Sequence, residues 1–153
     1  MGENNKKTLI VYYSRTGNSE IIAKDLQNKL GCDTDKIEYA NKKRVSFLGA
    51  LFEAFGKKTK AITGAEHNPG DYEKIIFITP VWAGAMSTPI RSYMAKHKAN
   101  IKSYSLIAAL TKDGFEYTIK DAVQIMQAEP TVSEQYLDSQ IKSGEYDLGK
   151  FLG

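Results

Sequence analysis

The sequence predicts an α/β fold in which an open parallel sheet carries helices on both faces. Two observations predict it. Short runs rich in β-branched and aromatic residues alternate about five times with amphipathic helical patterns, and the clearest strand-like runs are continuously apolar, as in strands covered on both faces. Each crossover is expected to be right-handed. With 153 residues, the chain is expected to form one domain spanning 1–153.

The expected strands are short apolar runs bounded by turn residues. Thr8–Tyr13 (TLIVYY) is the first, and its β-branched and aromatic residues are typical of a buried strand. Lys74–Thr79 (KIIFIT) is another, which Pro80 is expected to end. The remaining predicted strands are Thr34–Tyr39, Tyr104–Leu110 and Thr131–Leu137.

The expected helices follow these strands. Ser19–Leu30 has apolar residues close to i, i+4 spacing and is stopped by Gly31. Thr88 and Pro89 are the predicted N-cap and first residue of a helix that runs to about His97. Further helical segments are expected at Val45–Phe55, at Thr118–Gln127 and, as only about two turns, at Glu145–Leu152.

Composition excludes several classes of protein. The chain is 42% hydrophobic and 25% charged, as globular proteins are. No apolar run is long enough to cross a bilayer, and the run after Lys6 and Lys7 is too short for a signal peptide, so we expect a soluble, cytoplasmic protein. Cys32 has no partner for a disulfide, and neither His67 nor His97 has a partner at ligand spacing, so no metal site is predicted.

Charge is unevenly distributed along the chain, although the formal net charge is only +3. Residues 1–112 contain 18 Lys or Arg and 10 Asp or Glu, whereas residues 113–153 contain 3 and 8. Basic residues flank the segment 45–55, which we expect to cover the sheet with its lysines solvated. No basic stripe with interleaved aromatics occurs, so a nucleic-acid partner is not expected.

Three loops should carry the chemistry, because ligands of such sheets bind at the carboxyl ends of the strands. The first is Ser14-Arg15-Thr16-Gly17-Asn18-Ser19. Its backbone N–H groups are free to converge at a helix N-terminus, which suits a phosphate; the alternative is a tight turn with Ser and Asn as caps only. The motifs of P-loop triphosphatases and dinucleotide-binding folds are absent.

The second loop contains the single tryptophan of the chain. It is Pro80-Val81-Trp82-Ala83-Gly84-Ala85-Met86-Ser87. Trp82 could stack on a flat ring, while Ala83 and Gly84 would let main-chain groups reach the ring edge. Alternatively, Trp82 folds back over the core.

The third loop offers two further aromatic residues. It is Thr111-Lys112-Asp113-Gly114-Phe115-Glu116-Tyr117. Phe115 or Tyr117 could cover the ring face opposite Trp82. The alternative is an ordinary polar loop with a glycine turn.

Together, these segments resemble the flavodoxin family over about Leu9 to Val123. The first block, TLIVYYSRTGNSEIIAKDL, is similar to the start of a flavodoxin, whose phosphate loop has the form S/T-x-T-G-x-S/T. The second, IIFITPVWAGAMSTPIRSYM, resembles the third strand, the tryptophan loop and the next helix of the family. The third, DGFEYTIKDAV, is similar to a later loop that covers the second flavin face.

The resemblance implies a flavodoxin-like three-layer sandwich with five parallel strands in the order 2-1-3-4-5. It also implies non-covalent FMN, with Ser14 to Ser19 on the 5′-phosphate, Pro80 to Gly84 along the isoalloxazine, and Thr111 to Phe115 with Tyr117 closing the site. The chain departs from the family in its positive net charge, because flavodoxins are usually acidic around the flavin edge.

Three functions remain open on this evidence. The first is a monomeric FMN-dependent electron carrier that docks a reductase and then an acceptor, and it needs no catalytic residues of its own. The second is an FMN-dependent oxidoreductase that passes hydride from NAD(P)H to a quinone-type acceptor. The third is a flavin-free interaction domain on the same fold.

Overall fold

The core of the protein is a parallel sheet, seen in a computed structural model that describes residues 7–40, 59–82 and 84–153. Its strands pair in the order β2-β1-β5-β7-β8, which confirms the predicted order 2-1-3-4-5. They are β1 (Thr8–Tyr12), β2 (Asp33–Lys36), β5 (Lys74–Trp82), β7 (Tyr104–Leu110) and β8 (Ser133–Leu137).

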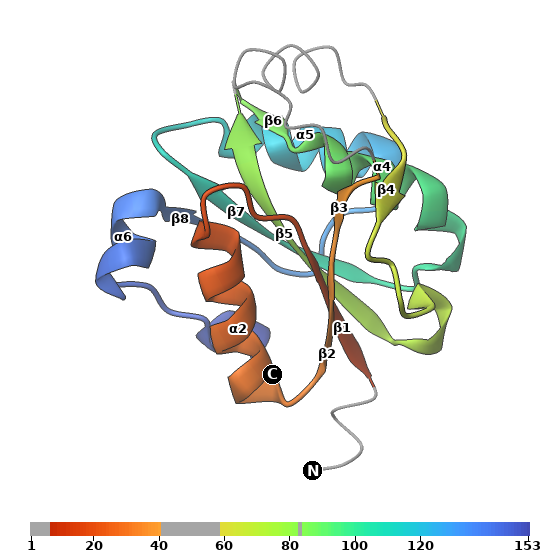
Figure 1. The fold of residues 1–153 in the computed structure, drawn as a ribbon, viewed down its shortest axis with the longest axis horizontal. Coiled ribbons are helices and arrows are strands. Elements are labelled where there is room, and N and C mark those ends of the chain that lie inside the picture. The colour runs from red at the N-terminus through yellow and green to blue at the C-terminus, as the bar shows by residue number, and fades with distance from the viewer. Residues whose placement is uncertain (1–6, 41–58, 83) are drawn as a thin grey trace.

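Helices cover both faces of this sheet, as predicted (Figure 1). Successive residues of a strand point to opposite faces. Accordingly, Ile10 belongs to one apolar cluster with side chains of α2 (Asn18–Leu30) and α6 (Asp138–Ser143). Leu9 and Val11 belong to the opposite cluster, with α4 (Thr88–His97) and α5 (Phe115–Met126). The expected helix at 45–55 lies outside the described residues.

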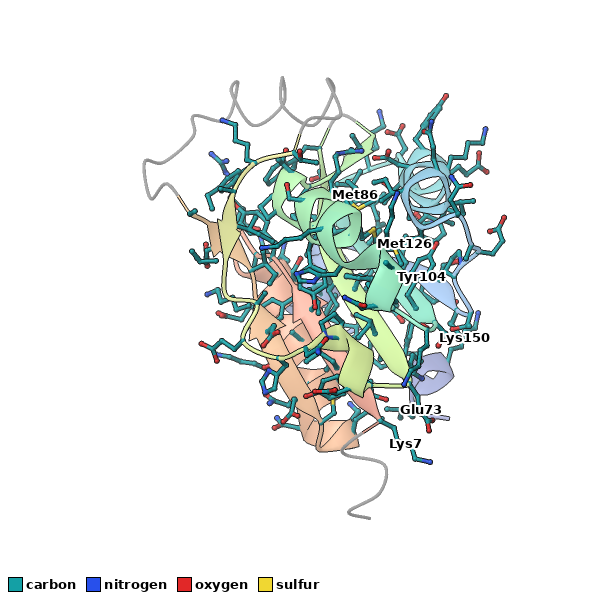
Figure 2. The ribbon with its side chains drawn as sticks, turned by 90° about the vertical axis from the view of Figure 1, so that its right-hand side faces the viewer. Lys7, Glu73, Met86, Tyr104, Met126 and Lys150 are labelled. Atoms are coloured by element: carbon teal, nitrogen blue, oxygen red, sulfur yellow. The ribbon has the colours of Figure 1, made fainter. Side chains whose placement is uncertain are left out.

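The strands of the sheet begin at one end of the molecule and end at the other. Lys7 and Glu73 form an ion pair of 3.7 Å where β1 and β5 begin. Met86 and Tyr104 are buried in the cluster under α4 and α5, and Met126 packs against it. Figure 2 shows Met86 at the end of the molecule remote from Lys7 and Glu73. The carboxyl ends of β1 and β5 therefore meet at the Met86 end, where the three loops converge.

The predicted second strand is split in the structure. β2 ends at Lys36, although the Ile37 N–H still donates to the Tyr12 carbonyl over 2.8 Å. Because β1 ends at Tyr12, the chain then leaves the sheet. Glu38–Tyr39 (β3) instead pairs antiparallel with Ile62–Thr63 (β4), a ribbon that the sequence did not predict.

The prediction that Pro80 ends the third strand is wrong, because β5 continues to Trp82. The Lys74 N–H donates to Lys7, and the Ile78 carbonyl accepts from Tyr13, so even-numbered residues of β5 direct their backbone groups toward β1. β1 has ended by the level of Pro80. The N–H that proline lacks would therefore have faced no strand, and the proline is tolerated.

Three helices begin earlier than predicted, and α2 does so by one residue, at Asn18. Ser87, and not Thr88, is the N-cap residue of α4. α5 begins at Phe115 and not at Thr118, because Gly114 adopts a left-handed conformation (φ 111°) that turns the chain directly into the helix. Phe115 and Tyr117 are therefore helical residues.

The carboxyl-terminal segment also differs from the prediction. α6 follows β8 directly, where the Gln140 side chain accepts the Leu137 N–H over 3.0 Å. The segment Glu145–Leu152 holds only a short 3-10 turn, Gly149–Phe151, which buries Phe151 against the α2 side of the sheet. Within the described ranges, no helix has the length and apolar character needed to span a membrane.

Candidate functional site

The loop between β1 and α2 is a tight turn held by Ser14. Its Oγ accepts hydrogen bonds from the N–H groups of Gly17 (3.1 Å) and Glu20 (3.2 Å). Gly17 has φ 100°, which permits the turn into the helix. Ser14 therefore caps α2, as the cap-only alternative requires, and the remaining polar residues decide whether the loop does more.

Ser19 is the residue that a cap role does not explain. It is 2% exposed, and its Oγ is buried without a hydrogen-bond partner among the described residues. A buried hydroxyl without a partner costs about 1–3 kcal/mol. Ser19 lies in the first turn of the 13-residue helix α2, where N–H groups lack intrahelical acceptors and the helix dipole is positive. An anion such as a phosphate would satisfy the Ser19 hydroxyl together with those first-turn N–H groups that do not already donate to Ser14.

Glu20, the acidic residue in the first turn of α2, is paired with two lysines. Glu20 binds Lys36 through a 2.9 Å hydrogen bond, which holds the Glu20 pKa below its ordinary value. Lys24 lies 3.9 Å from the same carboxylate. The negative charge of Glu20 is therefore largely offset, and it does not oppose an anion at the start of α2.

Trp82 occupies the last position of β5 and is half-buried. Its ring meets the Tyr13 ring edge-on, with centroids 5.9 Å apart, and packs against the core under α4 and α5. The Arg15 guanidinium carbon lies 5.6 Å from the Trp82 ring centroid. Trp82 therefore packs partly on the core, as the alternative interpretation of this loop expects. The Arg15 guanidinium, from the first loop, also lies over the ring.

The second segment is a β-hairpin, not an irregular loop. Ala85–Met86 (β6) pairs antiparallel with the end of β5, so that Val81 faces Met86. Gly84 has φ 75° in the turn, and Ala83 lies outside the described residues. The sequence holds a signal for this hairpin that was missed: the small residues Ala83-Gly84 stand between two apolar pairs, and glycine can adopt the positive φ that such a turn needs.

The third segment is tied to the edge of the sheet. Thr111 Oγ1 donates to Asp138 Oδ2 over 2.9 Å. Tyr117, in the first turn of α5, is 70% exposed. A Cβ placed on Gly84 would lie 3.7 Å from the Tyr117 ring, so the hairpin turn and this helix start are in contact.

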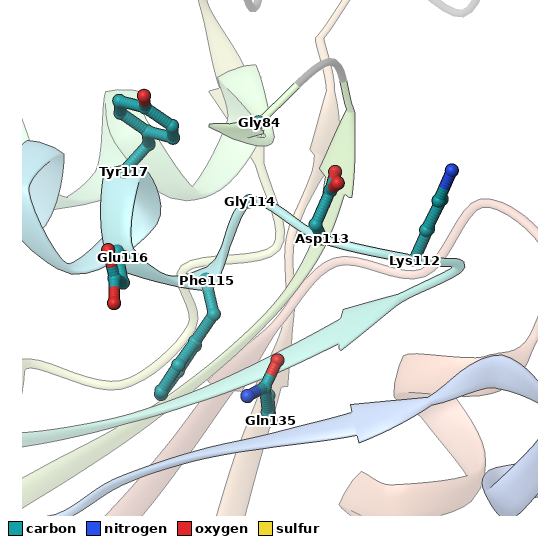
Figure 3. A pocket seen from close by; sticks show the side chains of 8 residues that line it. All are labelled: Gly84, Lys112, Asp113, Gly114, Phe115, Glu116, Tyr117 and Gln135. Carbon is teal, nitrogen blue, oxygen red and sulfur yellow. The ribbon is translucent and has the colours of Figure 1, made fainter.

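A cleft of about 620 Å³ opens beside this contact (Figure 3). Phe115 and Tyr117 extend in different directions from the start of α5, and Phe115 lies on the side of Gln135. Trp82 does not line the cleft, whereas Glu116 and Gln135, which were not predicted, do. The lining residues are Gly84, Lys112, Asp113, Gly114, Phe115, Glu116, Tyr117 and Gln135.

A buried ion pair connects the hairpin to the two helices that pack beside the site. Arg91 of α4, only 2% exposed, donates to Asp121 of α5 over 2.6 Å and to the Met86 carbonyl over 3.4 Å. One guanidinium thus joins the hairpin to both helices on that face. Within the described ranges, no group of three or more His, Cys, Asp or Glu is arranged to hold a metal ion.

Comparison with solved structures identifies the fold. A flavoprotein in complex with FMN from Lactobacillus acidophilus NCFM matches 90% of this chain and 97% of its own, with a TM-score of 0.75 and 18% identity. This chain has the flavodoxin-like fold. No protein-family model and no curated protein matches it.

Two further structures share the flavodoxin-like fold. The apo form of the Lactobacillus acidophilus flavoprotein covers 92% of this chain and 98% of its own, with a TM-score of 0.67 and 20% identity. Oxidised flavodoxin 2 from Bacillus cereus covers 91% of this chain and 92% of its own, with a TM-score of 0.51 and 16% identity. Ser14 to Gly17 connect β1 to α2, and Asn18 and Ser19 are the first two residues of α2, at the end of the sheet where ligands of such folds bind.

Proposed function

We propose that this protein binds FMN at the carboxyl end of its sheet and carries electrons between a reductase and an acceptor protein. The observation that carries the proposal is the buried hydroxyl of Ser19 in the first turn of α2, which has no hydrogen-bond partner within residues 7–40, 59–82 and 84–153. This donor lies at a place where helix N–H groups also favour an anion. The Lactobacillus acidophilus structure with the same fold contains FMN, which supports this choice of anion.

The chain would hold the two ends of FMN with different segments. Ser19 and the first N–H groups of α2 would bind the phosphate. Gly84, in the hairpin turn, and the start of α5 would hold the ring, with the exposed Tyr117 beside it. When bound, FMN supplies reversible redox chemistry at its ring.

The exposure of the charged residues that line the cleft favours a carrier over an enzyme. Its three charged lining residues, Lys112, Asp113 and Glu116, are all exposed. A group that shuttles protons during turnover is usually held in a water-excluded site, where its pKa is tuned. An open, solvated edge instead allows a partner protein to approach within electron-transfer distance.

A substitution of Ser19 tests the phosphate site. In Ser19→Ala, we expect FMN affinity, measured by calorimetry, to fall about tenfold or more, because a hydrogen bond to a charged group is lost. Without FMN, the same variant should be at least as stable as the wild type, because a buried unsatisfied group is removed. These opposite signs distinguish a ligand-binding hydroxyl from a structural one.

Ser139→Ala is the matched control, because Ser139 is also the second residue of a helix, α6, but is exposed. Neither quantity should change in this variant. Equal FMN affinity for Ser19→Ala and the wild type would remove the proposed phosphate contact.

The carrier role has its own test. The FMN-loaded protein is mixed with NADPH or NADH and a quinone without other proteins. A carrier should not consume the nicotinamide, yet should be reduced rapidly when a flavodoxin reductase is added. Sustained turnover by the isolated protein would favour the oxidoreductase instead.

A further inference from the structure

Arg15 links the phosphate loop to the tryptophan. It belongs to the segment Ser14 to Ser19, and its guanidinium lies over Trp82 with 5.6 Å between the guanidinium carbon and the ring centroid. Trp82 also packs on the core, and Tyr13 meets the indole edge-on. The cation therefore covers a face of the indole on which a flat ring would otherwise stack.

The cation–π contact between Arg15 and Trp82 is weaker than the contact that Arg15 could make with a phosphate. A guanidinium over an indole at a partly exposed position is held weakly by the ring quadrupole. A phosphate dianion offers the same guanidinium a stronger, bidentate, charge-assisted interaction. Arg15 lies four residues before Ser19, where the proposed anion site begins, so the phosphate and Trp82 would compete for the Arg15 side chain.

We propose that Arg15 selects phosphorylated flavin over riboflavin. Arg15 covers Trp82 in the ligand-free protein and gives up this contact to bind the phosphate when FMN enters, which frees the indole. Riboflavin has no phosphate, so it would have to displace Arg15 from Trp82 without compensation. This inference rests on the proposed function, because it assigns a specificity role within the same site.

The experiment compares FMN and riboflavin binding in wild type and Arg15→Gln, which keeps much of the side-chain length but removes the charge. Trp82 is the only tryptophan, so its fluorescence reports on both ligands. We expect FMN affinity to fall about tenfold or more in the variant. Riboflavin affinity should stay the same or rise, so the FMN preference over riboflavin falls.

Lys102→Gln is the matched control, because Lys102 is an exposed cation that precedes β7, at the end of the sheet away from the three loops. If removal of any positive charge lowered the preference, Lys102→Gln would change it as much as Arg15→Gln. That result would overturn the inference, and so would an unchanged preference in Arg15→Gln.

A measurement without ligand separates this inference from the proposed function. Acrylamide should quench Trp82 more strongly in Arg15→Gln than in the wild type, and Lys102→Gln should match the wild type. If the wild type bound no FMN, the proposed function and the inference would both fail. If it bound FMN and Arg15→Gln kept the same preference for it, only the inference would fail.

Discussion

A Cβ atom placed on Gly114 would lie 2.6 Å from the Cα of Gly84 and 3.0 Å from Cγ1 of Val81. Gly84, in the turn between β5 and β6, therefore packs directly against Gly114, the N-cap residue of α5, with no side chain between them. The segments proposed to hold the two sides of the flavin ring are thus one packed unit. Gly114 has φ 111°, so both its conformation and its surroundings require glycine.

Gly114→Ala should destabilise the protein more than the strain of a positive φ alone. Gly144 is the control, because it also has a positive φ (79°) but has no atom within 4 Å of an added Cβ. We expect Gly144→Ala to cost about 1–2 kcal/mol. Overpacking should add about 1–3 kcal/mol for Gly114→Ala. Urea unfolding measures both, and equal costs would show that the contact with Gly84 is not tight.

The Arg91–Asp121 pair should be much more important than surface ion pairs. Arg91→Met leaves the buried Asp121 carboxylate without its guanidinium, which we expect to cost about 3–5 kcal/mol. Lys29→Met breaks an exposed pair with Asp25 and should cost about 0.5 kcal/mol or less. Thermal or urea unfolding compares the two. A cost for Arg91→Met no larger than that for Lys29→Met would contradict the account.

His67 should make stability depend on pH. Its Nδ1 lies 2.6 Å from Oδ1 of the buried Asp35, and this hydrogen bond raises the His67 pKa above its ordinary value of 6.5. Asp33, 3.9 Å from Nε2, acts in the same direction. The contribution is complete below pH 6.5 and is lost as pH rises through the raised pKa.

The free energy of unfolding of wild type and His67→Gln, measured across this range, tests the sign. The two should differ most at acidic pH and converge at alkaline pH. His97 provides the opposite case, because burial lowers its pKa, so its contribution should be lost as pH falls. A His67→Gln difference that grew with pH would contradict the assignment.

Local sequence patterns predicted those parts of the fold that depend on a continuous run of residues. Tyr104–Leu110 was predicted from end to end, because every residue of this strand is buried and no neighbour alters its limits. The end of β5 was not, because Pro80 is tolerated only where β1 has already ended. That information lies in the pairing of two strands and not in either strand alone.

The residues of the candidate site were predicted only in part. The composition of Ser14 to Ser19 left a phosphate loop and a capped turn as alternatives, and only the structure shows that Ser14 is the cap while the Ser19 Oγ has no partner among the described residues. The contact between Arg15 and Trp82 was not predicted, since it joins residues from two strand ends. Arg91 and Asp121 are also far apart in the chain, and neither has a local signal that indicates a buried pair.

Retention of FMN by the purified protein tests the central claim most directly. The protein is mixed with an equimolar amount of FMN, passed through a desalting column, and its visible absorption and flavin fluorescence are recorded. The account predicts that FMN elutes with the protein, with a shifted absorption band and quenched fluorescence. Elution of all FMN in the small-molecule fraction, with an unchanged spectrum, would contradict it.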